Sequence, residues 1–308
     1  MKMNSLPPIM YLVERMKAAH GVFQSVLGAA TPDKVFDEKA VVISSDGKWL
    51  TEFTANNGLL AEAVLGADFP RQLGPVDLEH YTILPALKAI VTSQSLHLRS
   101  VANYLHAGEF ETFAREHNLE GYFADTEGGQ KVYEELSDDL FFISLTRPGN
   151  PDEPELWKSF ANDGKGVCLQ LRLTPKPASD LREMSYQTGT PTALKKINQK
   201  LANEGLVYTP WTISRICAFY LPLSYHYEKE VRLLVKRHKD GVDRTIDSGG
   251  SKAWPVSLAV AGATTGDPCG EIELLGIRKG PRCSIDAVKA TLAAGVYSGV
   301  PIRDWIER

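Results

Sequence analysis

The sequence lacks the short motifs that mark the commonest nucleotide-binding and hydrolytic folds. It contains no GxxxxGK[ST], the pattern of a P-loop, and no GxGxxG, the pattern of a dinucleotide-binding turn. The GxSxG of serine hydrolases and the HExxH of zinc peptidases are also missing. If the chain handles a nucleotide, it must do so on another scaffold.

Cysteine is scarce and widely spaced. The chain has four cysteines with no CxxC or CxxH pair among them: Cys168, Cys217, Cys269 and Cys283. A structural zinc ion needs closely spaced ligands to complete its tetrahedral shell, so the spacing predicts no metal site. We expect free thiols in a reducing cytoplasm.

Long apolar runs and a strong net charge are missing too. No stretch of about 18 residues is apolar enough to span a bilayer, so we expect no membrane association. The formal net charge of -4 gives no overall attraction to phosphate, and contact with nucleic acid would need a local basic patch. The candidate runs are residues 194–200, 235–239 and 277–282, although a solvated surface explains such runs more often.

What is present fits a globular protein with an N-terminal extension. The chain has 308 residues, of which 43% are hydrophobic, enough for one large domain or two small ones. Residues 8–28 have the spacing of an amphipathic helix, and residues 40–53 predict a hairpin around an Asp-Gly turn. The breaker DFPRQLGP at residues 68–75 predicts a boundary that makes residues 1–70 an α/β extension with a recognition or regulatory role.

Residues 71–308 alternate short strand patterns with helical ones, which predicts an α+β domain. Residues 226–237, HYEKEVRLLVKR, predict a strand that carries Glu228 and Glu230 on one face, because strand side chains repeat every two residues. Neighbouring carboxylates repel each other, so the pair needs a cation or a function. Arg232, on the same face, is one such cation, and an ordinary salt-bridged strand is the alternative interpretation.

Two further segments carry polar or aromatic groups at strand ends. His80, Tyr81 and Thr82 end one predicted strand directly before a short helix, and Ser144 lies near the end of another. The second strand leads to a helix with Trp157 and then to a Gly-Val-Cys strand. Each feature also has a structural explanation, since a buried His satisfies backbone groups and an LWxxF helix face is ordinary core packing.

These segments, in this order, resemble a family of bacterial proteins known as a domain of unknown function. Its members carry an HYT-like element, an LWxxY…GVC segment, an ExExR strand and a GxxxS tail, and the resemblance covers about residues 76–308. This chain departs from the pattern at Phe160, where Tyr is usual, and at Val231, where an aromatic residue is usual. It also has VANYLHAGEFE where the family has an NDPxE run.

The same layout is similar to a divergent ADP-ribosyltransferase fold, a split and mostly antiparallel sheet with helices. The resemblance implies that NAD is the substrate, that a His on the first strand binds its ribose, and that a Glu on a late strand drives transfer. Departure of nicotinamide builds positive charge on the ribose, which a fixed carboxylate stabilises best in a dry site. The site residues that the resemblance implies are Glu230 and Glu228 for catalysis, and His80, Tyr81, Thr82 and Ser144 for NAD.

The function that follows is mono-ADP-ribosyl transfer to an intracellular macromolecule, as a toxin or antiphage effector with a neutralising antitoxin as a further partner. Nucleic acid, RNA or DNA, is favoured over protein as the acceptor, with Lys236, Arg237 and Lys239 contacting its backbone. One alternative is a module on the same fold that binds a partner without catalysis. The other is a metal-dependent nuclease that uses Glu228 and Glu230.

Overall fold

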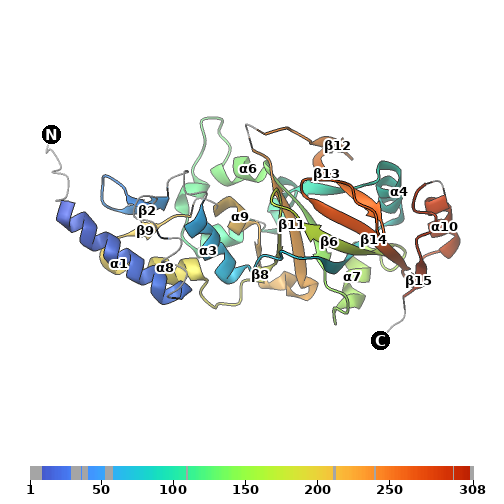
Figure 1. The fold of residues 1–308 in the computed structure, drawn as a ribbon, viewed down its shortest axis with the longest axis horizontal. Helices are drawn as coiled ribbons and strands as arrows, with labels where there is room; N and C mark the ends of the chain where they lie inside the picture. Colours follow the sequence, from blue (N-terminus) through green and yellow to red (C-terminus); the bar gives the residue numbers. More distant parts are fainter. Residues whose placement is uncertain are drawn as a thin grey trace.

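The computed structural model describes residues 9–28, 36, 41–52, 58–108, 110–210, 213–238, 241–293 and 295–305. The molecule is elongated, with helix α1 (Ile9–Leu27) at one end and helix α10 (Ile285–Ala293) at the other (Figure 1). One half is built around a large sheet, and the other half is mostly helical. The described residues contain no helix that is both long and apolar enough to cross a membrane.

A ten-stranded, mostly antiparallel sheet forms the first half, which we call the sheet half. Its strands are β3 (Val76–Thr82), β4 (Ser95–Ser100), β5 (Leu140–Thr146), β6 (Val167–Pro175), β7 (Asp180–Glu183), β11 (Glu230–Lys236), β12 (Ile246–Ser248), β13 (Ser251–Val260), β14 (Gly270–Lys279) and β15 (Ile302–Asp304). Eight of them follow in the order β12-β13-β14-β6-β3-β5-β11-β7, while β15 pairs with β14. Because β4 pairs with both β13 and β5, six strands form a closed circuit of paired neighbours: β13, β14, β6, β3, β5 and β4.

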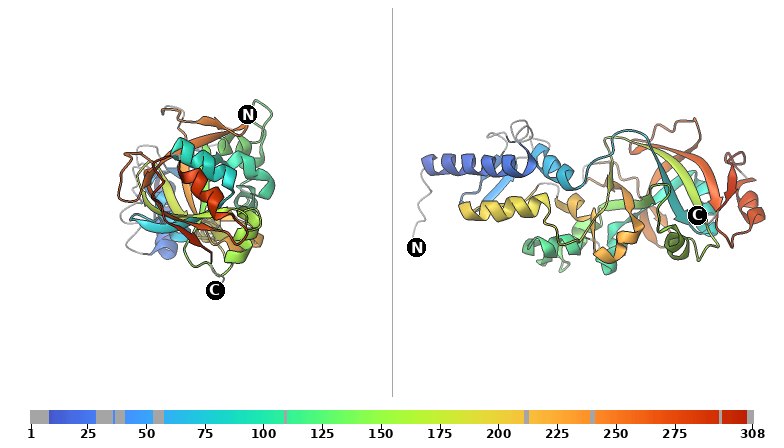
Figure 2. Two further views of the ribbon diagram at one scale, coloured as in Figure 1. Left: turned by 90° about the vertical axis from the view of Figure 1, so that its right-hand side faces the viewer. Right: turned by 90° about the horizontal axis from the view of Figure 1, so that it is seen from below.

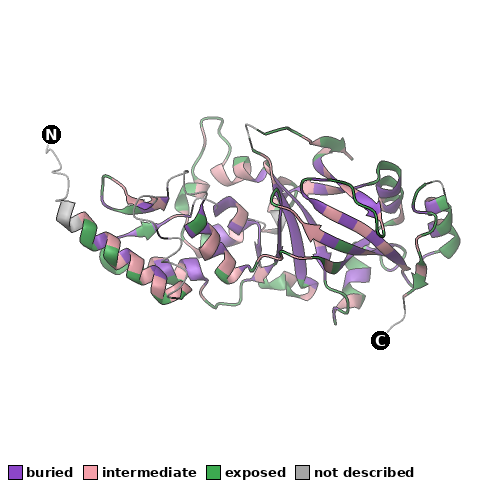
Figure 3. Cartoon of the chain, viewed as in Figure 1, coloured by how far each residue is buried: buried purple, intermediate pink, exposed green. Residues whose placement is uncertain are grey.

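Alternating side chains explain why these segments form strands with one buried face. Leu169, Leu171 and Leu173 of β6 are completely buried, whereas Arg172 between them is exposed. Figure 3 shows that the strands of the sheet are largely buried. Helices α4 (Leu84–Ser93) and α10 pack against each other at one end of this half, and α7 (Glu153–Phe160) packs against β3.

The other half, which we call the helical half, is assembled from segments that are far apart in the sequence. Its helices and helical turns are α1, α3 (Leu59–Asp68), η2 (Val101–Ala107), α5 (Glu111–Glu116), η3 (Glu120–Phe123), α6 (Val132–Ser137), α8 (Ala193–Leu201), η4 (Ala202–Glu204), α9 (Ile213–Cys217) and η5 (Leu223–Glu228). Its strands are β1 (Val41–Ile43), β2 (Trp49–Glu52), β8 (Ser185–Tyr186), β9 (Val207–Tyr208) and β10 (Tyr220–Leu221). They form the small sheets β1-β2-β9 and β10-β8.

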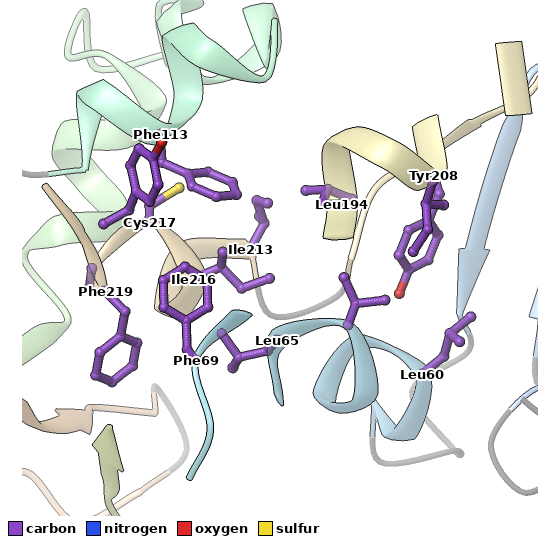
Figure 4. Packing of buried hydrophobic residues seen from close by; sticks show 14 of the residues in the cluster. Leu60, Leu65, Phe69, Phe113, Leu194, Tyr208, Ile213, Ile216, Cys217 and Phe219 are labelled. Atoms are coloured by element: carbon purple, nitrogen blue, oxygen red, sulfur yellow. The ribbon is translucent and has the colours of Figure 1, made fainter. Parts of the chain in front are cut away.

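The N-terminal segment shares one core with these later segments. Leu60 and Leu65 of α3 belong to the same buried cluster as Leu194 of α8, Tyr208 of β9 and Ile216 of α9 (Figure 4). Figure 2 shows α1 and α8 lying side by side, in agreement with their contacts. Ala19 and Phe23 of the first helix are completely buried in this cluster, whereas Val13 is 46% exposed. The boundary after residue 70 stays a prediction, but the segment before it has no separate core among the described residues.

Several predictions of local structure are confirmed. The helix expected over residues 8–28 is α1, and the expected hairpin is the β1-β2 pair. Its turn residue Gly47 has a φ of +73°, a conformation that glycine adopts without strain. The fold is mixed α+β with a mostly antiparallel sheet, as expected. All four cysteines are buried and free.

The strand predicted over residues 226–237 is wrong at its start. Glu228 is the last residue of η5, Lys229 has a φ of 43°, and β11 begins only at Glu230. The side-chain amide of Asn150 holds this turn because its Nδ2 donates to the backbone oxygens of Tyr227 (3.3 Å) and Glu228 (3.0 Å). Glu228 and Glu230 therefore do not lie on one face of a strand.

Candidate functional site

A cleft with a volume of about 380 Å³ brings together most of the residues that the sequence singled out. Its lining includes His80 and Thr82 of β3, Ser144 of β5, Glu228 of η5 and Glu230 of β11. The volume lies within the range of small-molecule sites, which is about 300–1,000 Å³. His80 and Glu230, which the resemblance assigns to one NAD site, line the same cleft.

The end of β3 is held in place by the Gly-Val-Cys segment. Thr82 pairs with Val167 and Tyr81 with Cys168 in the antiparallel register of β3 and β6. A side chain at Gly166 would collide with the backbone oxygen of Thr82, so this close approach requires glycine. The His80–Thr82 segment and the Gly-Val-Cys segment at residues 166–168 are therefore packed against each other beside the cleft.

His80 is held as a neutral ring whose second nitrogen can accept a hydrogen bond. Its Nδ1 lies 2.9 Å from the backbone oxygen of Ser144, and because a carbonyl oxygen only accepts, Nδ1 carries the hydrogen. Burial lowers the pKa of His80 below its ordinary value, although this hydrogen bond opposes the shift. The Nε2 atom is then unprotonated, which suits it to accept from a hydroxyl group.

Glu230 is engaged by Arg232 through both carboxylate oxygens. Nε of Arg232 lies 2.8 Å from Oε1 and Nη2 lies 3.0 Å from Oε2, and each side chain is 1% exposed. The guanidinium also donates to the backbone oxygen of Ala218 at 2.6 Å and stacks 3.8 Å above the ring of Phe142. The cation considered from the sequence is thus the partner of Glu230, and a bidentate pair of this kind fixes geometry more than it offers a reactive carboxylate.

Glu228 is a carboxylate that lines the cleft together with His80. It is 9% exposed and borders both the cleft and an adjoining cavity of about 50 Å³ that His80 and Ser144 also line. Burial raises the pKa of the neighbouring Tyr227 hydroxyl, and the negative charge of Glu228 adds to that shift. The turn at Lys229, which the sequence pattern did not reveal, is what separates Glu228 from β11.

Tyr81 does not line the cleft, contrary to the expectation that it binds NAD together with His80 and Thr82. Because side chains alternate along β3, the Tyr81 ring lies on the opposite face, edge-on to Trp157 with ring centroids 5.0 Å apart. It borders the adjoining small cavity but is absent from the lining of the cleft. Trp157 is a core residue, as expected.

The face of β3 that carries Tyr81 holds a buried polar network that sequence reasoning missed. Arg278 of β14 contacts Glu79 at 2.7 Å and Glu153 at 2.5 Å, and it donates to the Tyr81 hydroxyl at 3.1 Å. Burial raises the pKa of Glu79, and Arg278 opposes that shift. The pKa of the Cys168 thiol beside this network is raised by burial, which makes the thiol inert. The sequence signal that could have revealed this network is the presence of charged residues, Glu79 and Arg278, within otherwise apolar strand patterns.

Sequence reasoning also missed two cleft residues of β4, His97 and Arg99, although the alternation in SLHLRS places both on one face. Nη1 of Arg99 donates to the backbone oxygen of Ser248 at 2.5 Å and to Oγ of Ser251 at 3.2 Å. His97 contacts Oγ of Ser248 through Nδ1 at 3.0 Å, and its buried Nε2 has no hydrogen-bond partner among the described residues. This end of the cleft therefore offers the cation of Arg99 to an anionic group.

The basic run expected to contact nucleic acid is largely engaged in contacts within the protein. Lys236 is half-buried and donates to Oγ of Ser214 at 3.3 Å. Arg237 pairs with Asp139 at 2.7 Å and with Asp243 at 3.3 Å. Lys239 lies outside the described residues. The nucleic-acid contact stays a prediction, and the paired charges give it little support.

No family model, curated protein or solved structure matches this chain. Across the part of the chain that the structure describes, no group of three or more His, Cys, Asp or Glu side chains is placed to hold a metal ion. The case for a function therefore rests on the cleft itself.

Proposed function

We propose that this protein is an NAD-dependent mono-ADP-ribosyltransferase that modifies a macromolecule. The observation that carries the proposal is the meeting of β3, β5 and β11, which are far apart in sequence, at one cleft with a neutral His and buried carboxylates. The mixed α+β fold with its mostly antiparallel sheet agrees with an ADP-ribosyltransferase-like architecture. A role as a toxin or antiphage effector with a neutralising antitoxin is part of the same proposal.

The proposed roles of the two carboxylates differ from those inferred from the sequence. We assign Glu228, rather than Glu230, as the carboxylate that faces the ribose, because Glu228 borders both the cleft and the small cavity that His80 lines. The bond between nicotinamide and C1′ of the ribose breaks, and nicotinamide leaves with the electron pair. The negative charge of Glu228 stabilises the resulting positive charge. An acceptor atom then bonds to C1′ and gives its proton to Glu228.

Other cleft residues would hold the substrate. The unprotonated Nε2 of His80 accepts from a ribose hydroxyl, and Thr82 and Ser144 border the same position. Arg99 suits the diphosphate of NAD, since charge-assisted hydrogen bonds to phosphate are the strong ones. Glu230 keeps Arg232 in place below this surface.

The test is to incubate the protein with NAD and to measure nicotinamide release with and without RNA, DNA, purified protein and cell extract. We expect release that an acceptor accelerates, with nucleic acid as the proposed acceptor class and protein as the other outcome. ADP-ribose should appear on the acceptor, as measured by mass spectrometry. An absence of release under all of these conditions would contradict the proposal.

A second candidate is a module that binds NAD or another nucleotide without chemistry. The bidentate contact of Arg232 with Glu230 favours it, because a carboxylate held in this way is a structural group. Calorimetric binding of NAD without nicotinamide release would support this alternative.

A further inference from the structure

A second cavity, with a volume of about 480 Å³, lies at the far end of β11 from the cleft. The strand begins at Glu230 in the cleft and ends at Lys236 in this cavity. Lys236, Arg215, His238 and Asp180 contribute its polar lining. Leu234, Val235, Trp254 and Pro268 contribute an apolar wall. The combination is that of a small-molecule site, apolar with a few convergent polar groups.

Cations outnumber carboxylates in the network behind this cavity. Asp180 contacts Arg215 at 2.6 Å, Arg182 at 3.2 Å and Arg71 at 3.4 Å. Glu62 pairs with Arg182 and with Arg215. Three arginines thus share two carboxylates, which leaves an excess of one positive charge before Lys236 is added.

Lys236 has no carboxylate contact among the described residues. The hydroxyl of Ser214, 3.3 Å away, is its hydrogen-bond acceptor in that part of the chain. Burial lowers its pKa, and the charge of Arg215 lowers it further. Asp139 acts in the opposite direction, but its carboxylate is paired with Arg237. An anion placed beside Lys236 and Arg215 would remove the cost of holding two cations near each other.

Arg215 has capacity to bind such an anion. Asp180 and Glu62 take one N–H donor each from its two terminal nitrogens, and a guanidinium has five N–H donors. Its side chain is 23% exposed, so it is accessible from the cavity that it lines.

We infer that this cavity binds a small organophosphate, with the phosphate beside Lys236 and Arg215 and the organic part against the apolar wall. The volume exceeds what an inorganic ion requires, and the wall of Leu234 and Trp254 suits an apolar or aromatic body. The inference concerns a site separate from the cleft. It does not depend on the proposed transferase function.

The probes are AMP, inorganic phosphate and uncharged adenosine, titrated by calorimetry against the full chain. We expect AMP to bind, phosphate to compete with it, and adenosine to bind far more weakly. Lys236→Met should weaken AMP binding by about tenfold or more, as for the loss of a charge-assisted hydrogen bond. Lys236→Arg should retain most of the affinity.

Two control variants separate this site from others. Lys289→Met removes the same charge at an exposed position on α10 and should leave AMP binding unchanged. Because AMP is also part of NAD, the titration is repeated with Arg99→Met, which alters the cleft; the AMP binding that Lys236→Met weakens should persist in that variant. Equal affinity in Lys236→Met and the unaltered protein, or loss of all AMP binding in Arg99→Met, would overturn the inference.

A measurement without any variant covers the case in which Lys236→Met does not fold. Acetylation by acetic anhydride is followed at each lysine by mass spectrometry, with and without AMP. Bound AMP should protect Lys236 and not Lys289, and equal labelling with and without AMP would contradict the inference.

Discussion

The two halves of the molecule acquire their cores in different ways. In the sheet half, alternating apolar residues within each strand supply the buried face, as Leu169, Leu171 and Leu173 do in β6. In the helical half, the core is collected from distant segments, so that Leu60 of α3 belongs to the same cluster as Ile216 of α9. A core of the first kind is visible in sequence periodicity, and a core of the second kind is not.

The largest expected effect tests whether the helical half can lose its N-terminal segment. A chain that begins near Pro75 lacks α1 and α3 and uncovers completely or almost completely buried residues such as Leu194 and Ile216. Burying one side chain of this size is worth about 1.5–3 kcal/mol, so the loss of a whole layer should unfold this half. We expect the truncated chain to aggregate or to lose cooperative thermal unfolding. If it stays soluble and folded, residues 1–70 form a separable extension, as the sequence suggested.

A smaller effect is expected in the sheet half from Arg278→Met. The change leaves Glu79 and Glu153 without their shared cation in a largely buried network. We expect the free energy of unfolding to fall by about 3 kcal/mol, as measured by urea denaturation. Arg172→Met is the matched control, because its pair with Asp77 is about half exposed, and it should cost less than about 1 kcal/mol. Equal effects of the two changes would contradict the network.

Substitutions at two neighbouring residues of β3, His80 and Tyr81, should affect different properties: the first NAD binding, the second the stability of the fold. His80→Ala removes the cleft acceptor and should weaken NAD binding by about tenfold, as for the loss of one or two hydrogen bonds. Tyr81→Phe removes one hydroxyl from the network on the other face and should lower the free energy of unfolding by about 1 kcal/mol. NAD titration and urea denaturation of both variants check this, and NAD binding weakened equally by both would contradict the placement of Tyr81.

The smallest effect is a pH dependence of stability from His80. Its folded pKa lies below the ordinary value of 6.5, so below about pH 6.5 the unfolded state binds more protons than the folded state. The free energy of unfolding should therefore decrease as the pH falls from 6.5 toward the lowered pKa. His80→Gln should make that decrease less steep, with His97 and His117 contributing the remainder because burial lowers their pKa values too. An unchanged slope in urea titrations at several pH values would contradict the burial of His80.

Periodicity in the sequence predicted what depends on neighbours along the chain. It predicted that His80 and Thr82 lie at the end of a strand, and that a strand covers residues 230–236, although it started that second strand at residue 226. It did not predict the turn at Lys229, because that turn depends on a hydrogen bond from Asn150, which is distant in sequence. Because this turn separates Glu228 from β11, the roles that we propose for Glu228 and Glu230 differ from those that the sequence suggested.

Contacts between residues that are distant in sequence also determine which polar residues have a structural role. Tyr81 belongs to a network because Arg278, almost 200 residues later in the chain, donates to its hydroxyl. Arg237 is paired with Asp139 of another segment, so the basic run is less open than its composition suggested. Such pairings are set by topology, and a single sequence does not reveal which charged residues will meet.

The most direct test of the central claim compares Glu228→Gln with Glu230→Gln. We propose that Glu228 supplies the charge that faces the ribose, whereas Glu230 forms a structural pair with Arg232. Nicotinamide release from NAD should fall by about 100-fold or more in Glu228→Gln, with the unfolding temperature preserved. In Glu230→Gln the main effect should be a loss of stability, because Arg232 is left buried without its counter-charge. Near-normal release by Glu228→Gln, or no release by the unaltered protein, would contradict the account.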